Sequence, residues 1–114
     1  MGQTVYIIDE FVAAPGKGQE LLAAYADRYA PAAKARGMTL DRIIVSPPLW
    51  LDDASNRLTI TWTVQGAGGW WGQAVQSRYD PGVAAFWPSI EPLLVSRNRH
   101  FGAAQADVEE ISNV

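Results

Sequence analysis

The chain has 114 residues, nine basic and twelve acidic side chains, a net charge of −3 at neutral pH, no cysteine and one histidine. This length is typical of a single domain, and the acidic balance argues against nucleic-acid binding, which needs clustered lysine and arginine. Without cysteine there are no disulfide bonds, thiolate metal sites or cysteine nucleophile, and one histidine argues against a multi-histidine metal centre.

No apolar run reaches the roughly 20 residues of a membrane span, and the N-terminus lacks the features of a signal peptide. We therefore expect a cytoplasmic protein that binds no membrane, nucleic acid or metal. We expect one domain over residues 1–103 and an acidic, loosely ordered tail over residues 104–114.

The first half of the chain predicts a strand, a helix and a second strand. TVYIIDEFVAA, from Thr4, is rich in β-branched and aromatic residues and ends at the turn sequence PGKG. Over residues 19–36 apolar side chains recur every three or four positions, which predicts a helix that Gly37 ends. Pro31 lies inside it and removes a backbone hydrogen bond, so we expect a kink there. MTLDRIIVS, residues 38–46, predicts the second strand.

The second half predicts a strand, an interrupted helix and a last strand. RLTITWTVQ, residues 57–65, alternates Leu58, Ile60, Trp62 and Val64 with polar side chains, as a half-buried strand does. GAGG, residues 66–69, predicts a break before a helical segment that ends near Arg78. Asp80 and Pro81 are typical of a helix start, and VSRNRHFG, from Val95, predicts a polar fourth strand.

The order β-α-β-β-α-β is typical of a ferredoxin-like α+β fold, an antiparallel sheet with helices on one face. An open sheet face normally carries polar side chains, but the first strand is apolar on both faces. We therefore expect a second copy to cover the open face and form a homodimer through the sheets. The alternative is a monomer with an exposed apolar sheet. The two faces of the first strand carry Val5, Ile7 and Phe11, and Tyr6, Ile8 and Val12.

The element order, the doubly apolar first strand and the second-helix sequence YDPGVAAFWPSIEPLL resemble the dimeric α/β-barrel superfamily. This superfamily includes antibiotic-biosynthesis-monooxygenase-like, EthD-like and NIPSNAP-like proteins, and the resemblance covers about residues 4–103. It implies a homodimer with a ligand cavity between each sheet and its helices. It fixes no reaction, because similar proteins include oxygenases, cyclases, isomerases and haem enzymes. The haem-degrading branch uses a histidine on the second helix as iron ligand, and this chain has none there.

The aromatic residues predict an apolar pocket. An interrupted helix flanked by glycines is typical of a pocket wall or a mobile lid. Trp71, Ala74 and Arg78 share a helix face, which would place a cation beside an indole. The alternative is that the aromatic side chains fill the core or the dimer edge. The candidate pocket residues are Tyr6, Tyr25, Tyr29, Trp62, Trp70, Trp71, Tyr79, Phe86 and Trp87.

Three polar residues are candidates for catalysis: His100, Asp9 and Arg78. Histidine is the side chain best suited to proton transfer near neutral pH, although His100 at a sheet edge would also fit an exposed or merely hydrogen-bonded residue. Asp9 shares its strand face with Val5, Ile7 and Phe11, where an unpaired carboxylate is a candidate general base. Structural pairing with Arg42, Arg97 or Arg99 is the competing interpretation.

Two functions remain open. One is a small cofactor-independent enzyme, of monooxygenase, cyclase or isomerase type, acting on an apolar, aromatic or polycyclic oxygenated molecule. The other is a non-catalytic dimeric binding or accessory protein for such a hydrophobic molecule. No Ser-His-Asp spacing, phosphate loop or carboxylate metal motif is present, and we expect no cofactor.

Overall fold

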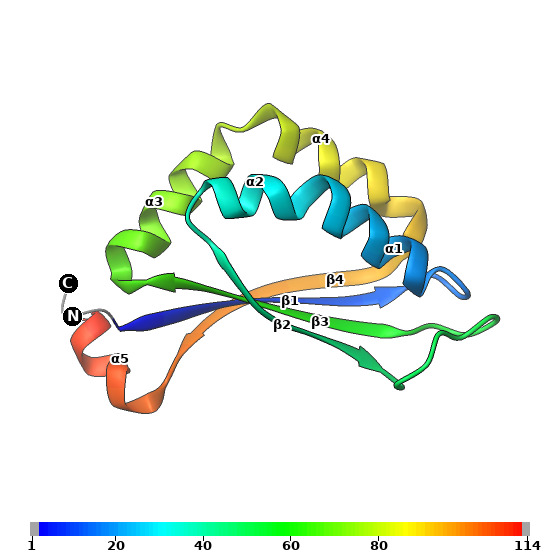
Figure 1. Cartoon of the computed structure of the whole chain (residues 1–114), viewed down its shortest axis with the longest axis horizontal. Helices are drawn as coiled ribbons and strands as arrows, with labels where there is room; N and C mark the ends of the chain where they lie inside the picture. Colours follow the sequence, from blue (N-terminus) through cyan, green and yellow to red (C-terminus); the bar gives the residue numbers. More distant parts are fainter. Residues whose placement is uncertain (1–2, 113–114) are drawn as a thin grey trace.

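The computed structural model describes residues 3–112 and is built around a four-stranded sheet in the order β2-β3-β1-β4. Helices α1 to α4 cover one face of this sheet (Figure 1). Every neighbouring pair of strands is antiparallel. The ferredoxin-like α+β class is therefore confirmed. The strands are β1 (Thr4–Ala13), β2 (Thr39–Ser46), β3 (Arg57–Gln65) and β4 (Leu94–Ala103).

The first helical region is continuous but irregular. It consists of α1 (Gly18–Ala24), a π-helical turn η1 (Tyr25–Tyr29) and α2 (Ala30–Ala35). The irregularity expected at Pro31 lies in the turn before it, because the proline ring presses on the carbonyl four residues earlier and a wider turn relieves that contact. Tyr25 and Tyr29 sit at the two ends of η1, and both are buried.

The second helical region is divided as expected, but its start differs from the prediction. α3 (Gly66–Arg78) begins inside the GAGG sequence, so the predicted break at residues 66–69 is wrong. Gly66 has a φ of +66°, which lets the chain turn directly from β3 into the helix. The break lies instead before α4 (Pro81–Ile90), where the Asp80 side chain accepts hydrogen bonds from the backbone N–H groups of Gly82 and Val83. A 3-10 turn, η2 (Glu91–Leu93), leads into β4.

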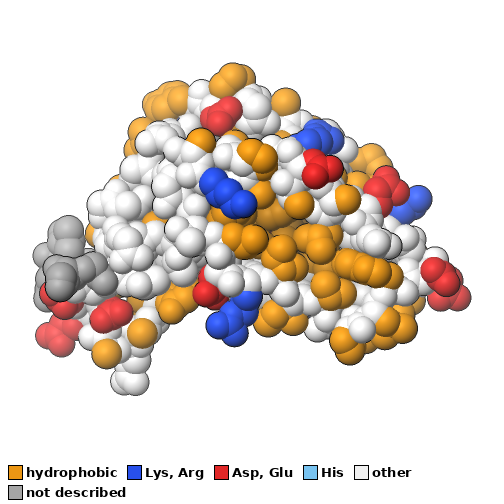
Figure 2. All heavy atoms as spheres, viewed as in Figure 1, with side chains coloured by type: hydrophobic (Ala, Val, Ile, Leu, Met, Phe, Trp, Pro, Cys, Tyr) orange, Lys and Arg blue, Asp and Glu red, His pale blue; other side chains and the backbone are white. Residues whose placement is uncertain are grey.

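The core lies between the sheet and these helices. β1 and β3 alternate as predicted, and their helix-facing side chains are buried. β2 is an edge strand and is exposed along most of its length. Apolar side chains gather between the front helices and this edge of the sheet (Figure 2). The large buried side chains are Ile7, Phe11, Leu21, Tyr25, Tyr29, Leu58, Ile60, Trp62, Phe86 and Ile90.

The other face of the sheet has no helix from α1 to α4 on it (Figure 1). Tyr6, Ile8 and Val12 lie there half-buried, with β4 on one side and Thr63, Thr61 and Arg57 of β3 opposite them on the other. The strand alternation predicted for β1 therefore places apolar side chains on both faces.

The loosely ordered tail that we expected over residues 104–114 is described only as far as residue 112, and residues 113–114 lie outside the described part of the chain. A short helix, α5 (Gln105–Ser112), follows β4 and lies at the end of the sheet where β1 begins (Figure 1). Val108 and Ile111, three positions apart, lie on one side of this helix and line a hollow with β1 and β4. These two apolar side chains give the helix an apolar side that faces the sheet. Across residues 3–112 no helix has the length and apolar character needed to cross a membrane.

Candidate functional site

An apolar hollow of about 340 Å³ lies among α3, α5 and one end of β1 and β4. The Trp70 ring packs edge-on against two others, with centroid distances of 4.4 Å to Trp71 and 5.2 Å to Phe101. Small-molecule pockets in proteins start at about 300 Å³, so the hollow has room for a small aromatic ligand. Its lining residues are Val5, Ala67, Trp70, Trp71, Phe101, Gly102, Ala103, Val108 and Ile111.

Small residues at the start of α3 bring its tryptophans close to the sheet. The backbone N–H of Gly66 donates to the carbonyl of Gln3, which ties the start of the helix to the start of β1. A Cβ atom at Gly69 would already touch the side chain of Val64 at 3.5 Å. Glycines disfavour a helix in isolation, but the positive φ of Gly66 and its hydrogen bond to Gln3 let this helix begin directly after β3.

A buried ion pair lies on the same face of the sheet. The Asp9 carboxylate, 1% exposed, accepts hydrogen bonds from Arg99 Nε at 2.5 Å and Arg99 Nη2 at 2.7 Å. Tyr25 Oη donates a third at 2.7 Å. Asp9 lies directly opposite Arg99 in the β1–β4 register. Of the three pairings that the sequence left open, the structure contains the one with Arg99.

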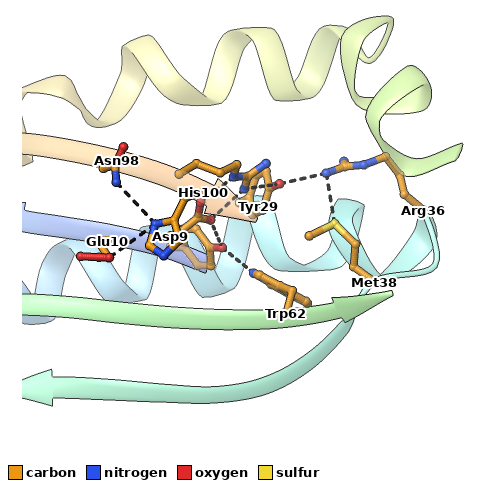
Figure 3. Close-up of polar contacts among 10 residues, drawn as sticks. Asp9, Glu10, Tyr29, Arg36, Met38, Trp62, Asn98 and His100 are labelled. Carbon is orange, nitrogen blue, oxygen red and sulfur yellow. Dashed lines mark hydrogen bonds and ion pairs between the residues drawn. The ribbon is translucent and has the colours of Figure 1, made fainter. Parts of the chain in front are cut away.

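The ion pair belongs to a chain of hydrogen bonds across the core (Figure 3). Trp62 Nε1 donates to Tyr25 Oη at 2.6 Å. Tyr29 Oη accepts from Arg99 Nη2 at 2.8 Å and from Arg36 Nη2 at 2.9 Å. Two guanidinium groups therefore share one phenol oxygen beneath the helices. Arg36 also packs over the Tyr29 ring, with its Cζ 5.5 Å from the centroid.

Burial and charge fix the protonation states of this network. Burial, and then the charge of Asp9 and its hydrogen bond, raise the pKa of Tyr25 well above its usual value. Burial alone would lower the pKa of Arg99, but its hydrogen bonds to Asp9 and the charge of that carboxylate outweigh burial and raise it. Tyr25 therefore stays a neutral donor and Arg99 a cation. Both oxygens of Asp9 are already engaged, which leaves it poorly placed to take a proton from a ligand.

The structure separates the three catalytic candidates. His100 lies on the open face of the sheet, where its Nδ1 is 3.5 Å from Glu10 Oε1 and 3.5 Å from Asn98 Nδ2 (Figure 3). Asp9 faces the helices, so the two residues do not form one site. Arg78 is exposed at the end of α3. Within residues 3–112 the cation–π contacts are made by Arg28, Arg36, Arg97 and Arg99, so Arg78 is not stacked on Trp71.

The predicted pocket residues fall into five environments. Trp70 and Trp71 line the hollow. Trp87 is half-buried on α4, under the guanidinium groups of Arg97 and Arg99. Tyr6 lies on the open sheet face, and Tyr79 is exposed after α3. The remaining four, Tyr25, Tyr29, Trp62 and Phe86, are buried in the core and do not line the hollow.

Several residues of the site were missed at the level of sequence. Phe101 lies on the helix-facing side of β4, two positions from Arg99, and the alternation of that strand is a signal that would have paired them. Val108 and Ile111 were assigned to the tail, although their spacing of three is helical. Arg36, at the end of α2, offers no sequence signal for its place in the network. Within residues 3–112 no three histidine, aspartate or glutamate side chains cluster as a metal site would require.

Comparison with known proteins identifies the fold of the chain but no activity. No protein family and no curated protein matches the sequence. An uncharacterised NIPSNAP domain protein from Burkholderia xenovorans has a TM-score of 0.71 and 20% identity over 90% of this chain and 95% of its own. A NIPSNAP family protein from Agrobacterium tumefaciens has a TM-score of 0.70 and 16% identity, covering 92% and 89%. A candidate antibiotic biosynthesis monooxygenase from Nitrosomonas europaea has a TM-score of 0.61 and 8% identity, covering 92% and 93%.

These neighbours bear out the resemblance drawn from the sequence. The chain has the ferredoxin-like fold of NIPSNAP and antibiotic-biosynthesis-monooxygenase-like proteins. At such low identity the likeness concerns the fold alone, so the function must be argued from the site.

Proposed function

We propose that the protein binds an apolar, aromatic small molecule in the hollow among α3, α5 and the sheet. The observation that carries this proposal is the set of three aromatic rings, with Trp70 packed against both Trp71 and Phe101, that lines an open volume of about 340 Å³. Trp71 and Phe101 remain 59% and 47% exposed, although large apolar side chains are more stable when covered. A ligand would provide that cover.

The weak attachment of α3 supports a route of entry. Its one fully buried residue is Gln73, whose Oε1 has no hydrogen-bond partner within residues 3–112. Trp70 Nε1 is likewise buried with no partner among those residues. A helix held by few apolar contacts and unsatisfied polar atoms can move at low cost. We therefore propose that α3 moves outwards as the ligand enters the hollow.

Titration of the protein with 1-naphthol, followed by calorimetry, tests the binding site. We expect saturable binding that weakens about tenfold in Trp70→Leu, because one stacked ring and its buried area are lost. Trp50→Leu is the matched control, since Trp50 lines a different hollow, next to the end of β2. An equal loss of affinity in both variants, or no saturable binding of 1-naphthol to the wild type, would show that the hollow is not the binding site.

Catalysis on such a molecule is the second candidate, and the hydrogen-bonded network favours it. Tyr29 Oη receives two guanidinium donors and gives its own proton to no described residue. Tyr29 is 1% exposed and does not line the hollow, so it can act as a general acid only on a molecule that enters when the helices above it open. Incubating the protein with oxygenated aromatic compounds and analysing products by mass spectrometry tests this. Turnover that is absent in every case, or unaffected by Tyr29→Phe, would leave binding as the function.

We also propose that two copies pair through their open sheet faces. Tyr6, Ile8 and Val12 supply the apolar contact there, and pairing would remove them from water. Sedimentation at micromolar concentration is expected to give a dimer for the wild type and a monomer for Ile8→Glu. Tyr79→Glu, an equally drastic change at an exposed position on the helix side, should remain dimeric. A monomeric wild type would refute the pairing.

A further inference from the structure

Two arginine side chains of β4 converge on one indole of α4. The Arg97 Cζ lies 4.2 Å from the centroid of the Trp87 ring, and the Arg99 Cζ lies 5.6 Å from it. Both residues point to the helix side of the edge strand, opposite Phe11 and Asp9 of β1. Arg97 is exposed and Arg99 half-buried, so water and Asp9 offset part of their repulsion, and a second anion beside them would offset more of it.

The described acidic residues do not balance these charges. Arg99 donates hydrogen bonds to Asp9 through Nε and Nη2. The Nη1 atom of Arg99 has no hydrogen bond to any residue of the described chain. Arg97 forms no salt bridge within residues 3–112. Arg36, linked to Arg99 through Tyr29, is buried and has no acidic partner there either. Three cations thus face one carboxylate, in a chain whose net charge is −3.

The arginines do not line the apolar hollow, but the helix-facing side of β4 runs from them to it. Along the helix-facing side of β4 the order is Arg97, Arg99, Phe101 and Ala103, and the last two line the hollow. Alternate residues of a strand are about 7 Å apart. A molecule of moderate length can therefore have its apolar part beside Phe101 and a charged group at the arginines.

We infer that the ligand is an apolar molecule with a carboxylate group. This inference rests on the proposed function and names the class of ligand. The carboxylate binds Arg97 and the free Nη1 of Arg99, beside Trp87, and the apolar part occupies the hollow. Arginine suits this role, because its planar group holds a carboxylate with paired, charge-assisted hydrogen bonds.

Two probes of the same length separate the charge from the apolar part: 4-phenylbutyrate and 4-phenyl-1-butanol. Calorimetry on the wild type is expected to give about tenfold tighter binding of the acid, the difference expected for one charge-assisted contact. In Arg97→Gln the preference should fall to about twofold or less. Arg42→Gln, which removes the same charge from an exposed site on β2, at the opposite edge of the sheet, should keep it. Arg99 is unsuitable for this test because it holds the buried Asp9.

Each outcome decides between the two proposals. Equal affinity of the wild type for acid and alcohol would overturn the carboxylate site and leave the apolar binding site standing. An equal loss of preference in Arg97→Gln and Arg42→Gln would also overturn it, because net charge alone would then explain the effect. Binding of neither probe would overturn both. Circular dichroism of each variant confirms that the fold is retained.

Discussion

Replacing Arg99 by methionine tests the buried ion pair that organises the core. The substitution keeps the length and apolar stem of the side chain but removes two of the three hydrogen bonds to Asp9, a carboxylate that is 1% exposed. Leaving a buried charge without its partner costs about 3–5 kcal/mol. The Arg99 side chain is 22% exposed, so water can replace part of the contact and we expect about 3 kcal/mol. Urea unfolding followed by circular dichroism measures this loss.

Two further variants separate the ion pair from general packing. Arg97→Met changes the same residue type two positions away on the same strand face. Arg97 has no carboxylate partner within residues 3–112, so this variant should lower the free energy of unfolding by less than about 1 kcal/mol. The double variant Asp9→Leu, Arg99→Met removes both charges and should be more stable than Arg99→Met alone. If the double variant instead loses the sum of the two single losses, the residues are not coupled and the reasoning fails.

Three other predictions concern single positions. Folding raises the pKa of Tyr25, so its contribution to stability is complete below about pH 10 and is lost at higher pH. The unfolding free energy of the wild type should therefore fall above pH 10 more steeply than that of Tyr25→Phe, by about 1.4 kcal/mol per pH unit. Gly16 and Gly37 both have positive φ, but only a Cβ atom at Gly16 would collide with the carbonyl of Asp52. Gly16→Ala should therefore cost at least about 1 kcal/mol more stability than Gly37→Ala in thermal unfolding. Equal losses would rule out the collision. Asn56→Ala should cost about 2 kcal/mol and speed proteolysis within residues 47–56, since the buried amide accepts from Leu51 N at 3.0 Å and donates to Leu49 O at 2.8 Å. Unchanged proteolysis would show that other contacts hold this loop.

The strands were predictable because their signal is local. In β3, Leu58, Ile60 and Trp62 alternate with threonines, and this period of two determines both the strand and its buried face. Asp80 was equally informative, since an aspartate before a proline satisfies the free N–H groups at a helix start through its own side chain. Element order then led to the fold class, because few topologies join these elements without crossing connections.

The helix starts and the site were less predictable because they depend on distant contacts. Gly66, Gly68 and Gly69 have poor helix propensity, and the helix starts there because Gly66 turns the chain out of β3 at positive φ and bonds to Gln3. Asp9 had three possible arginine partners in the sequence. The register of β1 against β4 selects Arg99, and a shift of one residue would have presented His100 instead.

The same alternation divides the chemistry of the chain between two surfaces. Asp9 and Glu10 are neighbours in sequence, as are Arg99 and His100, yet each pair splits across the sheet. On the helix side Asp9 and Arg99 form a buried ion pair beside the hollow, whereas on the open side Glu10 and His100 lie 3.5 Å apart in water. A ligand bound as proposed would therefore lie on the side of Arg99 and not on the side of His100. The histidine, which the sequence alone makes the first candidate for proton transfer, lies on the face where the second copy is proposed to bind. Under these proposals it would contact the second copy and not the bound molecule.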